Sequence, residues 1–541
     1  MQKSKLFIAL LGIGILPFTG FAQDKKDKAP ANWYNLDYKK DGIMGISTEK
    51  AYELLKGRKS TPVIVAVIDG GVDVEHEDLK DVLWINKKDA NKNGKDDDKN
   101  GYIDDKYGWN FIGGANGENV NYDNLEVTRL IAKYDPIYES VLPSTKLGEK
   151  QRREFVAYQK MISDYTTKYD EASFGNTNYG RLKANVDKIV AELGKEPKNI
   201  TKEDLADFKT QSRELKTAIS IIKKAIEKDS FEKFYDDIKE ADEYYGSQIK
   251  YHLNKEFDPR NIVGDNYEDA SERYYGNPDV KGPDAGHGTH VAGIIAAKRN
   301  NNIGVNGVAD NVQIMSIRVV PNGDERDKDV ANGIRYAVDN GAKIINMSFG
   351  KGYSYNKAIV DEAVRYAQEK DVLLVHAAGN DGKDIDINPN FPTKYFTDEQ
   401  NAITGEANNW LTVGATSWKL NDELLADFSN YGYKSVDVFA PGVEINSTMP
   451  ENEYKEQQGT SMAAPVVSGL AGLLKSYYPQ LTSKEIKDII MKSVTKVDQK
   501  VRIKKDGGSK KVYLDEISVS GGIVNAYNAI VEANNYINTK K

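Results

Sequence analysis

The stretch VIVAVIDGG, residues 63–71, decides the fold class of this chain. Its first six residues are apolar, and no polar residue interrupts them. A strand with one wet face alternates apolar and polar residues, so an unbroken run predicts a strand that is covered on both faces. The run ends at Asp69 and two glycines, which predicts a carboxylate at the carboxyl end of this strand.

Similar apolar runs recur along the chain, and amphipathic helix patterns lie between them. The runs cover residues 312–320, 343–349, 372–377 and 411–415, and the helix patterns cover residues 330–338 and 358–367. Strand and helix in repetition predict an α/β fold with a central, mostly parallel sheet and helices on both faces. Such sheets bind their ligands beyond the carboxyl ends of the strands.

Residues 123–254 differ from the rest, because they are rich in Lys, Glu, Asp and Tyr at helical spacing. Apolar stripes run over residues 155–169, 182–193 and 205–226, and Ser212 interrupts the third. Thr201 can cap the third helix with Asp204 as its capping-box partner. We expect an all-α insertion of about three or four long helices, packed as a bundle or hairpin.

The composition bounds the function. The chain has 541 residues, of which 39% are hydrophobic and 29% charged, which is enough apolar content for a real core. The net charge of -8 gives no support for nucleic-acid binding. The absence of cysteine excludes disulfides and cysteine-ligated zinc, so stability must come from packing or from bound cations.

The first 22 residues have the pattern of a secretory signal peptide. Lys3 and Lys5 precede an apolar stretch over residues 6–17, and Gly20 to Ala22 offers small residues for cleavage before Gln23. The alternative, a membrane anchor, needs a longer apolar stretch, and no later segment is apolar enough to cross a bilayer. We expect an exported protein without an integral membrane span after signal removal, either periplasmic or secreted.

Four motifs supply the groups that acyl transfer by a serine requires, namely a hydroxyl, a base, an acid that orients the base, and donors for the oxyanion. Asp69 closes the first strand, and His287 lies in GHGTHVAG. Ser461 lies in GTSMAAP, where a small-residue helix begins. Asn380 ends a buried strand in VLLVHAAGN, and its amide can donate to an oxyanion. Taken singly, Asp69 and Asn380 could equally be ordinary turn residues.

The segments DGG, HGTHVAG, AAGN and GTSMAAP together resemble the subtilisin-like serine proteases (peptidase family S8, the subtilases), over about residues 61–121 and 257–533. The resemblance implies a subtilisin-like three-layer fold and a serine endopeptidase acting on proteins or peptides. By the same resemblance, Asp69 orients the imidazole, His287 is general base and then acid, and Ser461 attacks the carbonyl. Asn380 and the Ser461 backbone N–H would hold the oxyanion.

The resemblance also implies two walls of a primary specificity pocket. One wall consists of Ser348, Phe349 and Gly350, and the other of Ala377, Ala378 and Gly379. Alternatively, these residues are tight strands packed for the core alone. Acidic residues near the expected substrate path suggest a preference for basic residues upstream of the cut; they are Asp284, Asp324, Glu325 and Asp327.

Two structural calcium sites are predicted, neither taking part in chemistry. Residues 96–105, DDDKNGYIDD, space oxygens at alternate positions around a glycine, like the first part of an EF-hand loop. Its candidate ligands are Asp96, Asp98, Asn100, Tyr102 and Asp104. The terminal bidentate glutamate is missing, and a solvated acidic loop is the alternative. The resemblance implies a second calcium site with Asp78 and Asn301.

We expect a signal peptide at 1–22, a short packed N-terminal segment at 23–60, a catalytic domain at 61–122 and 255–536, and the helical insertion at 123–254. Gly70 follows Asp69 where the family usually has Ser, Thr or Asp, so a supporting hydrogen bond is expected to be lost. The insertion separates Asp69 from His287 in sequence. It is either a surface subdomain or an arm that gates access or docks substrates and partners.

Two other functions stay open. The chain could be a non-catalytic binding or scaffold protein that has a subtilase fold and acts through the helical insertion. It could also be a zinc hydrolase using His287 and His290, with chelator-sensitive activity that survives loss of Ser461.

Overall fold

The computed structural model describes residues 28–227, 229–505 and 507–540. The predicted signal peptide, residues 1–22, lies outside the described residues. In the part of the chain that is described, every helix is too short or too polar to span a bilayer. This part forms two compact units, one of residues 127–257 and one of residues 29–126 together with 258–540.

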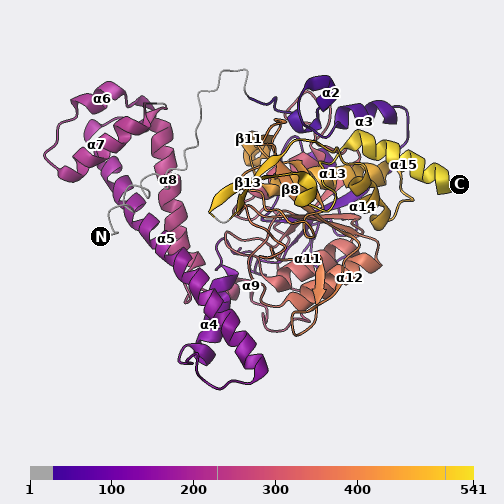
Figure 1. The fold of residues 1–541 in the computed structure, drawn as a ribbon, viewed down its shortest axis with the longest axis horizontal. Coiled ribbons are helices and arrows are strands. Elements are labelled where there is room, and N and C mark those ends of the chain that lie inside the picture. Colours follow the sequence, from indigo (N-terminus) through magenta and orange to yellow (C-terminus); the bar gives the residue numbers. More distant parts are fainter. Residues whose placement is uncertain (1–27, 228, 506, 541) are drawn as a thin grey trace. The chain divides into compact units, whose positions relative to one another are not determined.

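The larger unit is built on a seven-stranded parallel sheet in the order β2-β3-β1-β4-β5-β8-β9 (Figure 1). The strands are β1 (Val63–Asp69), β2 (Gly108–Asn110), β3 (Val312–Arg318), β4 (Ile344–Met347), β5 (Leu373–Ala377), β8 (Trp410–Thr416) and β9 (Val438–Pro441). β1 lies inside the sheet, paired with β3 and β4, and nearly all of its residues are buried. The α/β fold predicted from the sequence is confirmed.

Two apolar cores cover the two faces of the sheet. Along β1, Val65 and Val67 belong to one core and Ala66 and Ile68 to the other, as the alternation of a strand requires. The first core includes α10 (Gly286–Ala296) and α13 (Thr460–Tyr477), and the second includes α11 (Asp327–Asp339) and α12 (Lys357–Glu369). This arrangement is the three-layer fold that the sequence predicts.

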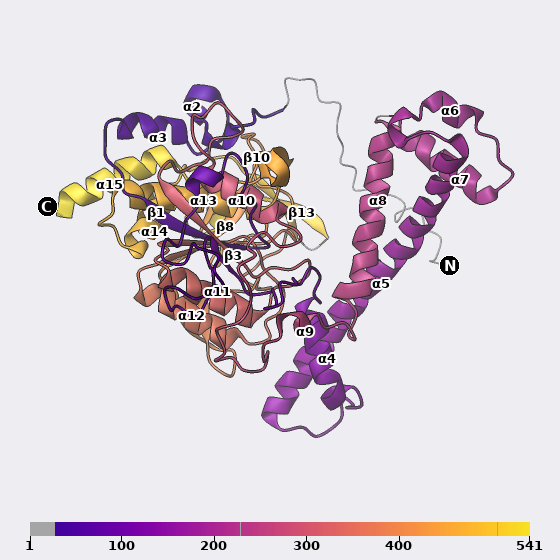
Figure 2. The same ribbon diagram turned by 180° about the vertical axis from the view of Figure 1, so that it is seen from behind.

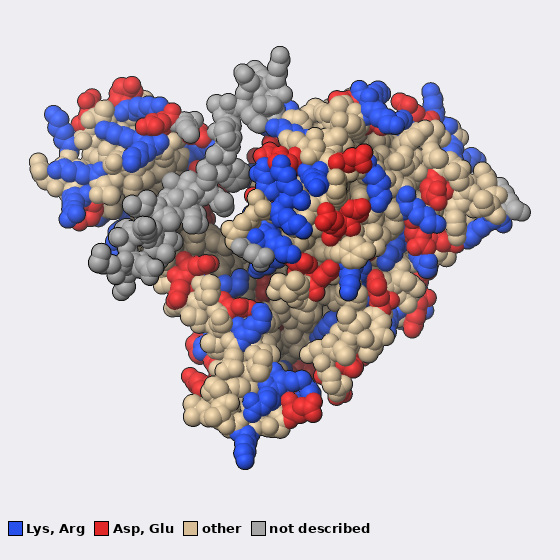
Figure 3. Space-filling model, in the orientation of Figure 1, with Lys and Arg blue, Asp and Glu red and all other residues tan. Residues whose placement is uncertain are grey.

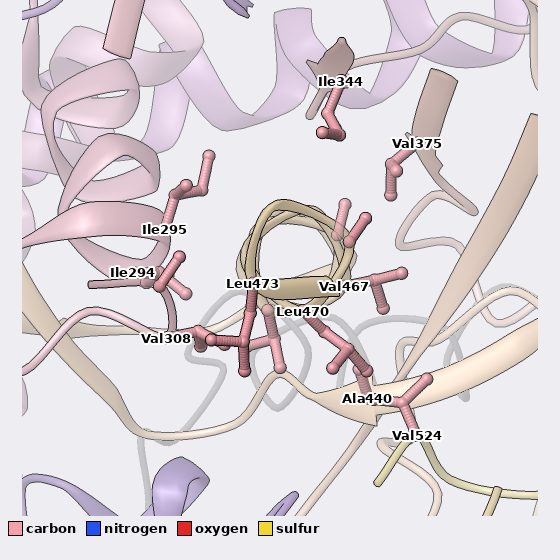
Figure 4. Packing of buried hydrophobic residues seen from close by; sticks show 14 of the residues in the cluster. Ile294, Ile295, Val308, Ile344, Val375, Ala440, Val467, Leu470, Leu473 and Val524 are labelled. Atoms are coloured by element: carbon pink, nitrogen blue, oxygen red, sulfur yellow. The ribbon is translucent and has the colours of Figure 1, made fainter. Parts of the chain in front are cut away.

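The helix α13 runs through the first core with apolar side chains on every side (Figure 4). Around it lie Ile294 and Ile295 from α10, Ile344 from β4 and Val375 from β5. Its glycines permit this approach, since a Cβ on Gly469 would lie 2.7 Å from Val308 Cβ. The small-residue helix predicted after the GTSMAAP motif is therefore a buried central helix.

The described part of the N-terminal segment packs onto the same core. Trp33 and Tyr34 are fully buried, and their polar atoms bond to the backbone carbonyls of Glu444 and Asn306 at 3.0 and 2.8 Å. The other helices of this unit are α2 (Tyr38–Asp41), α3 (Thr48–Leu55), α9 (Arg260–Val263), α14 (Ser483–Lys492) and α15 (Ala526–Lys540). Its antiparallel hairpins pair β6 (Tyr395–Thr397) with β7 (Ile403–Glu406), β10 (Ile445–Met449) with β11 (Glu453–Gln457), and β12 (Val501–Lys505) with β13 (Gly508–Val512).

The smaller unit is helical in its described residues. It contains α4 (Glu126–Tyr138), α5 (Glu149–Leu193), α6 (Lys202–Asp207), α7 (Arg213–Ala225), α8 (Phe231–Ser247) and a π-helical turn (Gln248–His252). α5 packs along α8, as both ribbon views show (Figure 2), and also contacts α7. The first two predicted stripes lie on the single helix α5. The third is two helices, because the Ser212 hydroxyl accepts from Leu215 N and begins α7.

Candidate active site

Asp69 and His287 meet at the carboxyl edge of the sheet. Asp69 ends β1, His287 is the second residue of α10, and Asp69 Oδ1 lies 2.8 Å from His287 Nδ1. Gly288 permits this approach, since a Cβ there would lie 2.2 Å from the Gly71 carbonyl oxygen. Asp69 is buried, while the His287 side chain is 43% exposed. The imidazole therefore contacts a buried carboxylate and is also accessible from solvent.

The surroundings of His287 favour its protonated form. Burial lowers the pKa of its imidazole, but the charge and hydrogen bond of Asp69 outweigh that effect, and Asp284 adds to them. The pKa of His287 is therefore raised above its ordinary value. A base with this partner can accept a proton and hold the resulting imidazolium.

The turn after Asp69 is fixed by its backbone and by Arg318. Gly70 N donates to Asp69 Oδ1 at 2.7 Å, while Asp69 Oδ2 is buried and has no hydrogen-bond partner among the described residues. The expectation that Gly70 removes a supporting hydrogen bond agrees with this. Arg318, paired with Asp69 in the β1–β3 register, donates from Nε to the Gly70 carbonyl at 2.8 Å. Arg318 was not predicted as a site residue, although a charged residue inside an apolar run is a visible signal in the sequence.

Ser461 is the second residue of α13, and its hydroxyl donates to the Ser348 carbonyl at 3.0 Å. In return, the Ser348 hydroxyl donates to the Ser461 carbonyl at 2.9 Å. Among the described residues, no hydrogen bond joins Ser461 Oγ to His287. Rotation about the Cα–Cβ bond moves a serine hydroxyl from one staggered position to another. Hydrogen bonds between catalytic residues are often long or absent when no substrate is bound.

Thr460 orients Asn380 beside Ser461. Asn380 Oδ1 accepts from Thr460 N at 2.8 Å and from Thr460 Oγ1 at 2.9 Å, which directs the amide N–H groups away from these bonds. Thr460 Oγ1 also accepts from Gly379 N at 3.0 Å. Thr460 was not predicted as a site residue, although it lies next to Ser461 in the GTSMAAP motif.

The two predicted pocket walls follow neighbouring strands, Ser348 to Gly350 after β4 and Ala377 to Gly379 at the end of β5. Asn390 lies against both walls. A Cβ on Gly350 would lie 2.4 Å from Asn390 Nδ2, and that nitrogen donates to the Ala377 carbonyl at 3.2 Å. A Cβ on Gly379 would lie 3.3 Å from Asn390 Cγ. Nothing in the loop sequence NPNFP marked Asn390 beforehand.

The predicted acidic neighbourhood is wrong for two of its members. Glu325 and Asp327 are buried, and Lys351 Nζ bonds to the Glu325 carbonyl at 2.6 Å and pairs with Asp327 at 2.7 Å. Glu126 is the third partner of Lys351, at 2.5 Å. The charge of Lys351 is compensated in the interior by Asp327 and Glu126, and these buried groups do not present a field to a substrate. Asp284 is exposed, as the prediction required.

His290 has a structural environment. It is fully buried, its Nε2 lies 2.9 Å from the Lys455 carbonyl, and burial lowers its pKa to about 4. His287 Nδ1 is held by Asp69. The two histidines therefore use ring nitrogens for protein contacts, and this geometry gives the zinc alternative no support.

The acidic loop contains a cluster of three carboxylates whose oxygens lie within 4.8 Å of one another, namely Asp89, Asp96 and Asp98. Asp89 is buried and was not predicted as a ligand. The Asn100 amide donates to Asp98 at 3.4 Å, whereas the Asp104 carboxylate accepts from Gly94 N at 2.9 Å and so lies elsewhere. The Tyr102 side chain packs in the second core. Of the predicted ligands, Asp96 and Asp98 belong to this cluster, and the calcium site stays a prediction.

Asp78 and Asn301 are also brought together. Asn301 Nδ2 donates to Asp78 Oδ1 at 2.7 Å, and Val305 N donates to Asp78 Oδ2 at 3.2 Å. Asp78 is fully buried, and burial raises the pKa of its carboxyl group. The carboxylate thus already holds the loop after α10 through hydrogen bonds.

Comparison with known proteins agrees with this site. The model of the subtilase family matches residues 176–511, more than half of the chain, a stretch that contains His287, Asn380 and Ser461 but begins after Asp69. The thermophilic serine proteinase of Bacillus sp. (strain AK1) is 42% identical over 191 residues, which are 35% of this chain and 42% of that protein. Thermitase of Thermoactinomyces vulgaris is 40% identical over 221 residues, 40% of this chain and 72% of thermitase.

The cell wall-associated protease of Bacillus subtilis (strain 168) is 36% identical over 248 residues, 46% of this chain and 25% of that protein. The chain thus spans less than half the length of two of these three relatives. The family match, the parallel sheet and the Asp–His contact at its edge agree with one another. The chain belongs to the subtilase family.

Proposed function

We propose that this chain is an exported serine endopeptidase that hydrolyses peptide bonds in proteins or peptides through Asp69, His287 and Ser461. The observation that carries the proposal is the 2.8 Å contact between Asp69 Oδ1 and His287 Nδ1 at the carboxyl edge of the parallel sheet, and membership of the subtilase family supports it. The names of its relatives, which are proteases, support the same class of reaction.

The reaction follows from the roles of these groups. After the Ser461 hydroxyl turns from the Ser348 carbonyl, His287 Nε2 takes its proton while Oγ bonds to the substrate carbonyl carbon. The imidazolium then gives that proton to the leaving amine as the C–N bond breaks. A water molecule repeats both steps on the acyl-enzyme and frees Ser461.

Asn380 and the Ser461 backbone N–H would stabilise the oxyanion. The Asn380 carbonyl oxygen is fixed by two bonds from Thr460, so its N–H groups are held in one orientation before substrate binds. Preorganised donors of this kind contribute about 3–4 kcal/mol to transition-state stabilisation. The N-terminus of α13 favours the same negative charge.

We also propose a structural role for calcium. Three carboxylates as close as Asp89, Asp96 and Asp98 repel one another, and hard oxygen ligands of this kind suit Ca²⁺. Asp78, with Asn301, is the second candidate, provided that the Asn301 amide turns its oxygen toward the ion. A bound ion would tie down loops that no disulfide can hold.

The helical insertion is proposed to gate or recruit substrates. The residues that flank it in sequence form buried ion pairs within the larger unit, since Glu126 pairs with Lys351 and Arg260 pairs with Asp329. Replacing residues 127–257 by a short linker tests this role. Unchanged kcat/KM for a folded protein substrate, relative to a short peptide, would remove it.

A serine-directed fluorophosphonate probe tests the activity itself. We expect the folded protein to be labelled, and labelling to disappear in Ser461→Ala without a change in thermal unfolding. Absence of labelling in the folded wild-type protein would instead favour the non-catalytic scaffold that acts through the helical insertion.

A further inference from the structure

The hairpin of β12 and β13 carries an unusual density of positive charge. Residues 496–511 contain seven Lys and Arg against two Asp, in a chain whose net charge is -8. Val501, Ile503 and Val512 are buried, whereas the cations of this segment are exposed. The exposed cations are Lys496, Lys500, Arg502, Lys504, Lys505, Lys510 and Lys511. Figure 3 shows Lys and Arg side chains gathered over the hairpin that Figure 1 labels β13.

Neighbouring carboxylates neutralise only part of this charge. Arg502 and Lys511 lie opposite each other in the β12–β13 register, where like charges repel, and both pair with Asp422 at 2.7 and 3.1 Å. Lys504 lies 3.8 Å from the exposed carboxylate of Asp427. Asp384 is a further carboxylate near Lys505. Within residues 496–511 the seven cations outnumber the two Asp, so this segment carries an excess of positive charge that the neighbouring acids neutralise only in part.

The hairpin lies beside the loop that follows Asn380. A Cβ on Gly382 would lie 3.4 Å from Lys504 Cδ and 3.9 Å from its Nζ, and Gly382 comes two residues after Asn380. Tyr431 fixes this arrangement, since its hydroxyl donates to the Lys504 carbonyl and its N–H to the Lys383 carbonyl. Two residues span at most about 8 Å, which places the Lys504 ammonium within roughly 13 Å of Asn380 Cα.

An extended peptide advances about 3.3 Å per residue, so this distance corresponds to about four residues of a bound substrate. We propose that the hairpin recognises acidic polypeptides, by binding Asp and Glu side chains within about four residues of the bond that is cut. The inference rests on the proposed peptidase function, and it names the substrate class of that same site. It replaces the preference for basic residues that the sequence suggested.

Charge complementarity sets the size of the effect. Two unit charges about 8 Å apart in water change a binding constant roughly twofold, and three such pairs multiply to about eightfold. The effect must fall as salt rises, because the Debye length shortens to a few ångströms near 1 M. A polypeptide is favoured over a lipid or glycan polyanion because the cations border the loop of the proposed oxyanion donor, where a substrate chain must pass.

The test compares peptides that differ only in charge. Three Glu are placed in the four positions before the cleaved bond in one peptide and after it in a second, and Gln replaces them in a third. At roughly 20 mM NaCl, we expect kcat/KM for one of the two Glu peptides to be about fivefold to tenfold higher than for the Gln peptide. At roughly 0.5 M NaCl, we expect the same ratio to be less than about twofold. Equal kcat/KM values at low salt would overturn the inference.

The matched variants are Lys504→Gln/Lys505→Gln/Lys510→Gln and the control Lys39→Gln/Lys56→Gln/Lys59→Gln, which removes three exposed cations from around α2 and α3. We expect the hairpin variant to lose the preference for Glu and the control to keep it. The single reversal Lys505→Glu, at an exposed position, should reduce the preference on its own. Equal loss in both triple variants would overturn the inference.

Two further outcomes separate this inference from its alternatives. If none of the peptides is cleaved, the proposed peptidase function fails, whatever the hairpin does. Binding to vesicles that contain about a third of anionic lipid, lost in the hairpin variant while peptide preference is absent, would assign the hairpin to a membrane surface and overturn the substrate proposal.

Discussion

The helices α13 and α5 show how differently the two units of this protein are built. Of the 18 residues of α13, 15 are buried, whereas only seven of the 45 residues of α5 are buried. α13 is surrounded by the sheet and by α10, while α5 packs along α8 and α7 on a narrow stripe. Because α13 is packed on all sides, its position in the core is fixed. The position of Ser461, the second residue of α13, is fixed with it.

The largest expected effect concerns that serine. Ser461→Ala should lower kcat/KM for peptide hydrolysis roughly 10⁴- to 10⁶-fold, because the nucleophile is lost while the fold is kept. Replacing residues 127–257 by a linker should leave cleavage of a short peptide within about tenfold of wild type. A deletion variant that is folded but as inactive as Ser461→Ala would contradict the expectation that peptide hydrolysis depends on the larger unit alone.

Core truncation sharpens the same comparison. Leu473→Ala in α13, where the side chain is fully buried, should lower the free energy of unfolding by about 2–5 kcal/mol through lost burial and the cavity left behind. Val156→Ala in α5, where the side chain is 59% exposed, should change it by less than about 0.5 kcal/mol. Urea unfolding measures both, and similar losses would argue that α5 is enclosed as tightly as α13.

Buried carboxyl groups make the larger unit sensitive to pH. Burial raises the pKa of Glu325 to about 8, although Lys351 lowers it in part. The folded state therefore holds a proton that the unfolded state releases near pH 4–5, and stability falls as pH rises from there to about 8. Glu325→Gln should remove this loss and raise the free energy of unfolding at pH 9 by about 1–3 kcal/mol.

The control for that prediction is Glu214→Gln on the exposed side of α7, a carboxyl group whose pKa the Ser212 hydrogen bond lowers. Its substitution should not remove the loss of stability between pH 5 and 8. Urea midpoints across this range decide the matter, and an unchanged pH dependence in Glu325→Gln would refute the assignment.

The smallest expected effect concerns the pocket walls. Asn390→Gly removes the amide that lies against Gly350 and Gly379, which should leave more space between the two walls. We expect the ratio of kcat/KM for a large over a small residue before the cleaved bond to rise about tenfold. Hydrolysis of matched peptides with Ala or Phe at that position measures the ratio. A ratio unchanged from wild type would place Asn390 outside the substrate pocket.

The sequence determined the sheet and the candidate catalytic residues, because both depend on patterns of neighbouring residues in the chain. An unbroken apolar run such as residues 63–68 can be satisfied only by cover on both faces. Asp69, His287, Asn380 and Ser461 stand at strand ends and helix starts, and the motifs around them resemble one family. The resemblance supplied their roles, which periodicity alone could not.

Tertiary structure alone decided which groups meet across long sequence separations. Asn390 contacts both pocket walls, Lys351 bonds to the Glu325 carbonyl and pairs with Asp327, and Lys504 lies beside Gly382. It also placed two predicted helices on the single helix α5. Such contacts depend on how strands and loops are packed in space, and the intervening residues of the chain carry no local signal of them.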